Sequence, residues 1–63
     1  MNKNLVDARK ERGLTISEAA QGIGLSQSML SMLETRQRSG SDSTKKKVAK
    51  FYEKSIEEIF YYD

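Results

Sequence analysis

The sequence contains no cysteine, histidine, proline or tryptophan. Without cysteine there is no disulfide and no thiolate nucleophile, and without histidine the commonest zinc ligand and the usual base of a serine nucleophile are missing. No apolar run approaches the roughly 18 residues that a membrane span needs, and no signal-peptide pattern opens the chain. We therefore expect a cytoplasmic protein that is not an enzyme and holds no metal or cofactor.

Charge is distributed unevenly along the 63 residues, although the net charge is only +2. Residues 36–54 hold seven basic side chains against two acidic ones, Asp42 and Glu53. Such a concentrated basic segment favours a polyanionic partner more than the total charge does. A hydrophobic fraction of 37% with 32% charged residues is typical of a small folded domain, near the lower size limit for folding without a staple.

Helix start and stop signals divide the chain into about five short helices. The predicted N-cap residues are Asn4, Thr15, Ser26, Ser41 or Ser43, and Ser55. Thr15 with Glu18, and Ser55 with Glu58, have the spacing of capping boxes. The alternation that marks a strand never persists, so the sequence predicts an all-α domain.

Residues 15–34 have the pattern of two helices joined by a turn. Apolar residues recur at helical spacing from Ile16 to Ile23, and Gly24 permits the positive φ of a sharp turn. The outer face of the second helix carries short uncharged groups, namely Gln27, Ser28, Ser31 and Met32. Exposed helix faces normally carry Lys and Glu. The uncharged polar groups here are instead suited to contact the edges of DNA bases, and the open alternative is an ordinary surface helix.

With these features the chain resembles the Cro/phage-repressor-type (XRE-type) helix-turn-helix domains from about Leu5 to Phe60. The matching stretches are LVDARKERGLT (5–15), GLSQS (24–28), LSMLE (30–34) and SIEEIF (55–60). The resemblance implies one compact five-helix, lambda-repressor-like domain over residues 1–63, with the helix-turn-helix at about 16–35. It also implies a transcriptional regulator, most simply a repressor of prokaryotic or phage type found with the nucleoid.

The resemblance further implies roles for individual residues. The base-reading residues would be Gln27, Ser28, Ser31 and Met32. The phosphate-contacting residues would be Thr15, Ser17, Ser26, Arg36, Gln37, Arg38 and Lys45. Arg9 and Glu34 match a structural ion pair of the family. The implied partner is a double-stranded DNA operator with an inverted repeat, bound by a homodimer, with no small-molecule ligand or membrane partner.

Several alternatives stay open at the level of sequence. Lys45, Lys46 and Lys47 suit a solvated helix face as well as DNA, and Met29 and Met32 suit the core. The whole fold could instead serve a protein-interaction module, such as an antitoxin-like or anti-repressor component. An enzyme is the weakest alternative, because the clustered C-terminal acids lie where a helix N-terminus favours them anyway.

Overall fold

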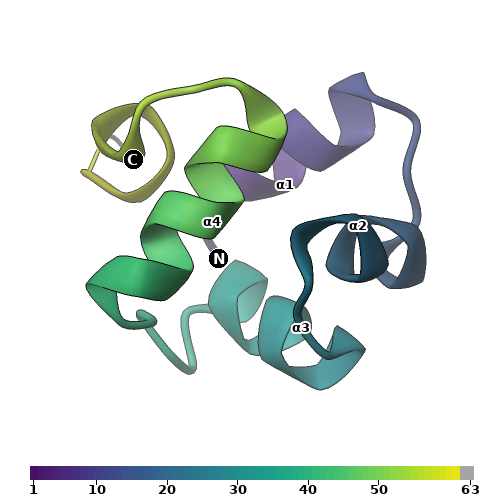
Figure 1. Ribbon diagram of the computed structural model, residues 1–63, viewed down its shortest axis with the longest axis horizontal. Helices are drawn as coiled ribbons and strands as arrows, with labels where there is room; N and C mark the ends of the chain where they lie inside the picture. The colour runs from purple at the N-terminus through teal and green to yellow at the C-terminus, as the bar shows by residue number, and fades with distance from the viewer. Residues whose placement is uncertain (62–63) are drawn as a thin grey trace.

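The computed structural model describes residues 1–61, which form four α-helices and one short π-helical turn. They are α1 (Lys3–Glu11), α2 (Ile16–Ile23), α3 (Gln27–Thr35), α4 (Asp42–Tyr52) and η1 (Glu57–Tyr61). Figure 1 shows α4 crossing the molecule, with α2 and η1 on opposite sides of it. No strand occurs in this part of the chain, so the all-α, five-helix prediction is confirmed.

Most helices begin at the residues that the sequence predicts. The hydroxyls of Thr15, Ser26 and Ser41 each accept a hydrogen bond from the backbone three residues on. Thr15 and Glu18 form both bonds of a capping box, with distances of 3.1 and 2.9 Å. These bonds lower the pKa of Glu18 below its usual value, because they stabilise the charged carboxylate.

The first helix begins earlier than predicted, so Asn4 as its N-cap is wrong. Asn2 caps the helix instead, with its side-chain Oδ1 accepting from the backbone N of Leu5 at 3.1 Å. Asn2 is only 3% exposed, and its own backbone N donates to the carbonyl of Glu34 at 2.7 Å. Both asparagines are suitable N-cap residues by local sequence. The contact between Asn2 and the distant helix α3 therefore determines which of them caps α1.

The core takes side chains from every helix. Its largest fully buried members are Leu5, Leu30, Leu33, Val48 and Ile59. Small residues allow α2 to approach its neighbours closely, and one of them, Ala20, is buried. Gly22 is equally important, because a Cβ there would lie 2.5 Å from Cε1 of the Phe51 ring.

The C-terminal turn is shorter and wider than the predicted α-helix. Its capping box is present, since Ser55 N donates to Glu58 and Glu58 N donates to the Ser55 hydroxyl. Ile59 is fully buried, and Phe60 packs partly against the core. The apolar residues Ile56, Ile59 and Phe60 at this end of the chain therefore belong largely to the core of the protomer.

No helix within residues 1–61 has the length and apolar character needed to cross a bilayer.

Candidate nucleic-acid interface

The exposed face of α3 carries the four residues that the sequence suggested for reading bases. Gln27 and Ser28 are exposed in the first turn, and Ser31 and Met32 follow one turn later, each half-buried. All four line one shallow, open depression in the surface, whose lining includes no charged residue from the part of the chain that the structure describes. The structure therefore brings an amide, two hydroxyls and a thioether together on one side of α3.

The turn between α2 and α3 fixes the direction in which that face points. Gly24 ends α2 with φ 92°, in the left-handed region that disfavours a side chain. Gly24 N and Leu25 N both donate to the carbonyl of Ala20, at 2.9 Å each. Ser26 then starts α3 by accepting from the backbone N of Met29 at 3.0 Å. The angle between the two helices is thus set by a few local bonds.

The loop after α3 is held close to the end of that helix. Arg36 caps α3 with φ 66°, a conformation that sequence reasoning did not foresee at a non-glycine residue. The backbone N groups of Gln37 and Arg38 both donate to the carbonyl of Met32, at 2.9 and 3.2 Å. Gly40 also has a positive φ, and a Cβ there would lie 3.1 Å from a methyl of Leu33. The basic side chains of this exposed loop therefore flank the C-terminal end of α3.

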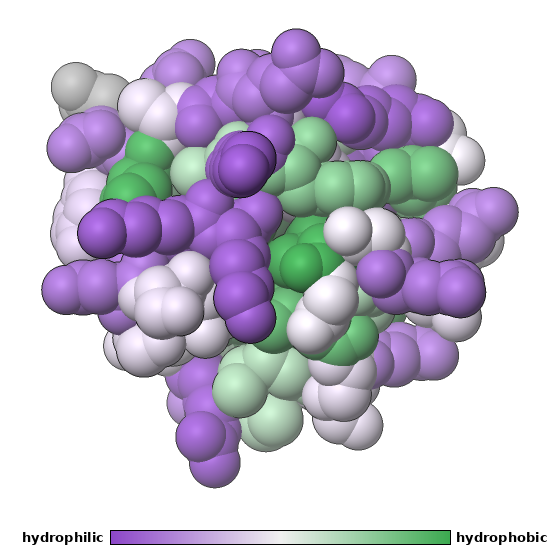
Figure 2. Space-filling model, viewed as in Figure 1, coloured by the Kyte–Doolittle hydropathy of each residue, from purple (hydrophilic) through white to green (hydrophobic). Residues whose placement is uncertain are grey.

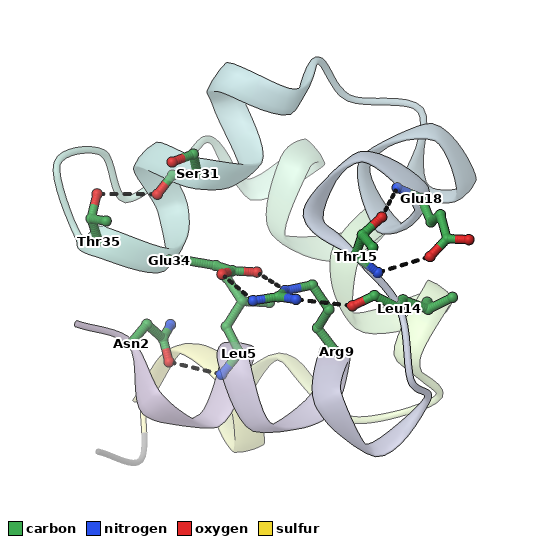
Figure 3. A network of polar contacts seen from close by, with 9 residues as sticks. All are labelled: Asn2, Leu5, Arg9, Leu14, Thr15, Glu18, Ser31, Glu34 and Thr35. Atoms are coloured by element: carbon green, nitrogen blue, oxygen red, sulfur yellow. Dashed lines mark hydrogen bonds and ion pairs between the residues drawn. The ribbon is translucent and has the colours of Figure 1, made fainter.

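An ion pair between Arg9 and Glu34 joins α1 to the last turn of α3 (Figure 3). Nε of Arg9 lies 2.8 Å from Oε2 of Glu34, and Nη2 lies 3.2 Å from Oε1. The remaining nitrogen, Nη1, donates to the carbonyl of Leu14 at 2.9 Å. The hydrogen bonds that Arg9 donates to the Glu34 carboxylate raise the pKa of Arg9 above its usual value. This geometry is that of a structural clamp on α3.

The start of α2 lies beside the same face. Ile16 and Ser31 line one depression, together with Glu34 and Thr35. Ser17 is exposed one residue further along α2, and Thr15 is occupied in its capping box with Glu18. Sequence reasoning missed Thr35, whose hydroxyl donates to the carbonyl of Ser31 at 3.1 Å (Figure 3). At the start of α2, Ile16 is therefore the residue that borders the candidate reading face, and Thr15 and Ser17 are its neighbours along the chain.

Lys45 occupies a different environment from the other lysines of α4. It is half-buried, and its Nζ donates to the hydroxyl of Tyr61 at 3.2 Å. Lys46, Lys47 and Lys50 are exposed, in line with a solvated helix face. The contact between Lys45 and Tyr61 joins α4 to η1, and no local sequence signal indicated it.

Apolar side chains also gather near the centre of one face of the molecule. Figure 2 shows them between α4 and the α2–α3 pair, surrounded by hydrophilic residues. Among residues 1–61, the only large hydrophobic residues that are mostly exposed are Met1 and Tyr61. The surface patch therefore consists of side chains that are partly buried against the core.

Comparison with known proteins agrees with this arrangement. The sequence model of the family HTH_3, described as helix-turn-helix, matches residues 5–59. The match spans the greater part of the chain and includes α2, the turn at Gly24 and α3. No curated protein and no solved structure gives a significant match.

Proposed function

The chain belongs to the Cro/C1-type helix-turn-helix (XRE) family of DNA-binding transcription regulators. From that premise we propose that it is a sequence-specific repressor that occupies a DNA operator as a homodimer, in the nucleoid of a prokaryotic or phage system. The observation that carries the proposal is the uncharged face of α3, which is flanked by the basic loop at residues 36–38.

In this proposal α3 enters the major groove and reads base edges. Gln27 can both donate to and accept from adenine through its amide, and the hydroxyls of Ser28 and Ser31 can donate or accept. Met32 supplies an apolar contact for the methyl group of thymine. Because these four groups line one open depression, they can meet adjacent base pairs together.

Contacts with phosphate would set the register of α3 on the duplex. The proposed residues surround α3 on two sides and are Thr15, Ser17, Ser26, Arg36, Gln37, Arg38 and Lys45. The start of α2, at Ile16, lies beside Ser31, Glu34 and Thr35 in the C-terminal half of α3, and the basic loop follows directly after that helix. Sequence-independent attraction would therefore act beside the reading face, mainly at its C-terminal end.

Two-fold pairing would double this surface. Two copies related by a dyad place their reading helices about 34 Å apart, one turn of B-DNA, so the operator would be an inverted repeat. Each copy alone offers a short α3 of 9 residues, which limits how many base pairs one protomer can read. Dimerisation thus supplies the length of site that specificity requires.

The second candidate is a protein-interaction module built on the same fold. The apolar patch between α4 and the α2–α3 pair favours it, because such patches also serve protein partners (Figure 2). The two candidates differ in their response to salt, since phosphate contacts weaken steeply with ionic strength and apolar contacts do not.

Selection of bound sequences from a random pool of duplex DNA tests the proposal. We expect an inverted repeat to be enriched, with half-sites about one helical turn apart. A chain with Gln27→Ala, carried through the same selection, should lose the preference at one position of each half-site. Recovery of no common sequence would contradict a sequence-specific regulator and favour the protein-interaction module.

A further inference from the structure

A basic pocket lies where the α3–α4 loop meets α4 and η1. It has a volume of about 160 Å³, and its lining includes Asn2, Leu33, Arg36, Arg38, Lys45 and Phe60. Among residues 1–61, the lining contains cations from the loop and from α4, and it contains no carboxylate. Leu33 and Phe60 contribute apolar surface, which lowers the local dielectric and strengthens attraction between the cations and an anion. The pocket therefore has the chemistry of an anion site.

The position of Lys45 in this pocket depends on the C-terminal turn. Its Nζ lies 5.1 Å from the ring centroid of Tyr61 and 5.7 Å from that of Phe60. It also donates to the Tyr61 hydroxyl at 3.2 Å. An ammonium has three N–H donors, so two of them remain for an anion after this bond. The Tyr61 hydroxyl, having accepted from Lys45, still has its own proton to donate.

The position of Arg38 depends on α3. Its backbone N is bonded to the carbonyl of Met32, which is the same carbonyl that holds Gln37. The loop therefore starts in a fixed place, although the Arg38 side chain is exposed. Arg38, from the loop after α3, and Lys45, which is bonded to Tyr61 of η1, thus line the same small pocket.

We infer that this pocket is an oxyanion site in which Arg38 and Lys45 converge on a single phosphate group, and that Tyr61 is the positioning residue for Lys45. The inference rests on the proposed function for one source of that group, the phosphodiester backbone of DNA. A free phosphate ion has the same chemistry and is the second source. In either case Tyr61 of η1 controls the strength of an anion contact made by Lys45 of α4.

The first experiment uses inorganic phosphate, and it is independent of both dimerisation and operator sequence. Backbone amide NMR spectra are recorded during a phosphate titration, with chloride at matched ionic strength as the reference. Saturable shifts are expected around Arg38, Lys45 and Phe60. They should be lost in Lys45→Met and reduced in Tyr61→Ala, whereas Tyr61→Phe, which keeps the ring, should retain most of the effect. Lys50→Met, an exposed lysine on the same helix, is the matched control.

The second experiment measures binding to a random-sequence duplex at several salt concentrations. Lys45→Met should weaken binding about tenfold, as expected for a charge-assisted hydrogen bond, and should lower the salt slope. Because Arg38 and Lys45 share one phosphate, the fold-loss of DNA affinity in the double variant Arg38→Ala/Lys45→Met should be smaller than the product of the two single fold-losses. Tyr61→Ala should lower the salt slope as well, although it removes no charge.

The outcomes separate this inference from the proposed function. Effects on DNA without shifts in free phosphate would identify the backbone phosphodiester as the source, and saturable phosphate shifts would identify the free ion as a ligand too. If Lys45→Met and Tyr61→Ala matched the unmodified chain in both experiments, the oxyanion site would be overturned, while enrichment of an operator would still support a regulator. If no variant bound DNA but phosphate shifts persisted, the regulator would fail and the oxyanion site would stand.

Discussion

Arg9 and Glu34 form two nitrogen–oxygen contacts of 2.8 and 3.2 Å, with side chains that are 14% and 6% exposed. The same glutamate accepts from the backbone of Asn2 through its carbonyl, at 2.7 Å. Side chain and backbone of Glu34 are thus both bonded to the N-terminal part of the chain. Since Glu34 lies in the last turn of α3, these bonds hold the candidate reading helix against α1.

The first prediction concerns the coupling of this pair. Arg9→Met or Glu34→Leu alone should lower the free energy of unfolding by about 1–4 kcal/mol, because each leaves a mostly buried charge unpaired. The double variant should lose less than the worse single variant. Urea unfolding of the natural sequence, the two single variants and the double variant completes this double-mutant cycle. Strictly additive losses would show that the two side chains are uncoupled.

The second prediction concerns Tyr52, which is buried in α4. Its hydroxyl has no hydrogen-bond partner among the described residues. Leaving a buried hydroxyl unpaired costs free energy, so Tyr52→Phe should raise the free energy of unfolding by about 1–2 kcal/mol at neutral pH. Thermal and urea unfolding check the sign. A clear loss of stability would show that the hydroxyl is bonded in solution.

The third prediction follows from the pKa of the same residue. Burial, with a further contribution from the charge of Glu34, raises the pKa of Tyr52 to about 12. In the unfolded chain a tyrosine ionises near pH 10. The part of the folding stability that depends on a protonated Tyr52 is therefore fully present below about pH 10, and it is lost as pH rises to about 12. The loss should be on the order of 2 kcal/mol. The Tyr52→Phe variant serves as reference, because the lysines ionise in both proteins. A stability difference independent of pH would contradict the raised pKa.

The fourth prediction concerns the close approach of α2 and α4. Alanine normally stabilises a helix interior by about 1 kcal/mol relative to glycine. At Gly22 the added Cβ would lie 2.5 Å from the Phe51 ring, so Gly22→Ala should destabilise the natural sequence. In a Phe51→Ala background the same change should be stabilising. If Gly22→Ala stabilised both backgrounds equally, the two helices would not be in tight contact there.

The fifth prediction concerns assembly. Sedimentation equilibrium at micromolar concentration should give a mass near twice the 7.2 kDa of one chain. Removal of residues 61–63 should shift the equilibrium toward the monomer, because the C-terminal turn carries the exposed Tyr61, of which 58% is accessible. A monomer of unchanged mass in both proteins would contradict the homodimer.

Features that depend on residues a few positions apart could be predicted from the sequence. Thr15 and Glu18 need only each other and one helical turn, and Gly24 needs only its own φ. The face of α3 follows from helical periodicity in the same way. These predictions are confirmed because regular helix geometry fixes how residues a few positions apart lie relative to one another.

Features that depend on packing between distant segments could not be predicted. The choice of Asn2 over Asn4 follows from a bond to Glu34, and Gly22 matters only because Phe51 packs against it. The link from Lys45 to Tyr61 spans two elements. Periodicity and capping rules contain no information about which helices will meet. They did not distinguish Lys45 from the neighbouring lysines, and only the family resemblance singled it out.

The most direct test of the account compares Gln27→Ala with Arg38→Ala on the selected operator and on random DNA. If α3 reads bases, Gln27→Ala should cost about 1–3 kcal/mol on the operator and little on random DNA. Arg38→Ala should weaken both DNAs alike and lower the salt slope by about one unit. If Gln27→Ala weakened both DNAs equally, or changed neither, α3 would not be the reading element.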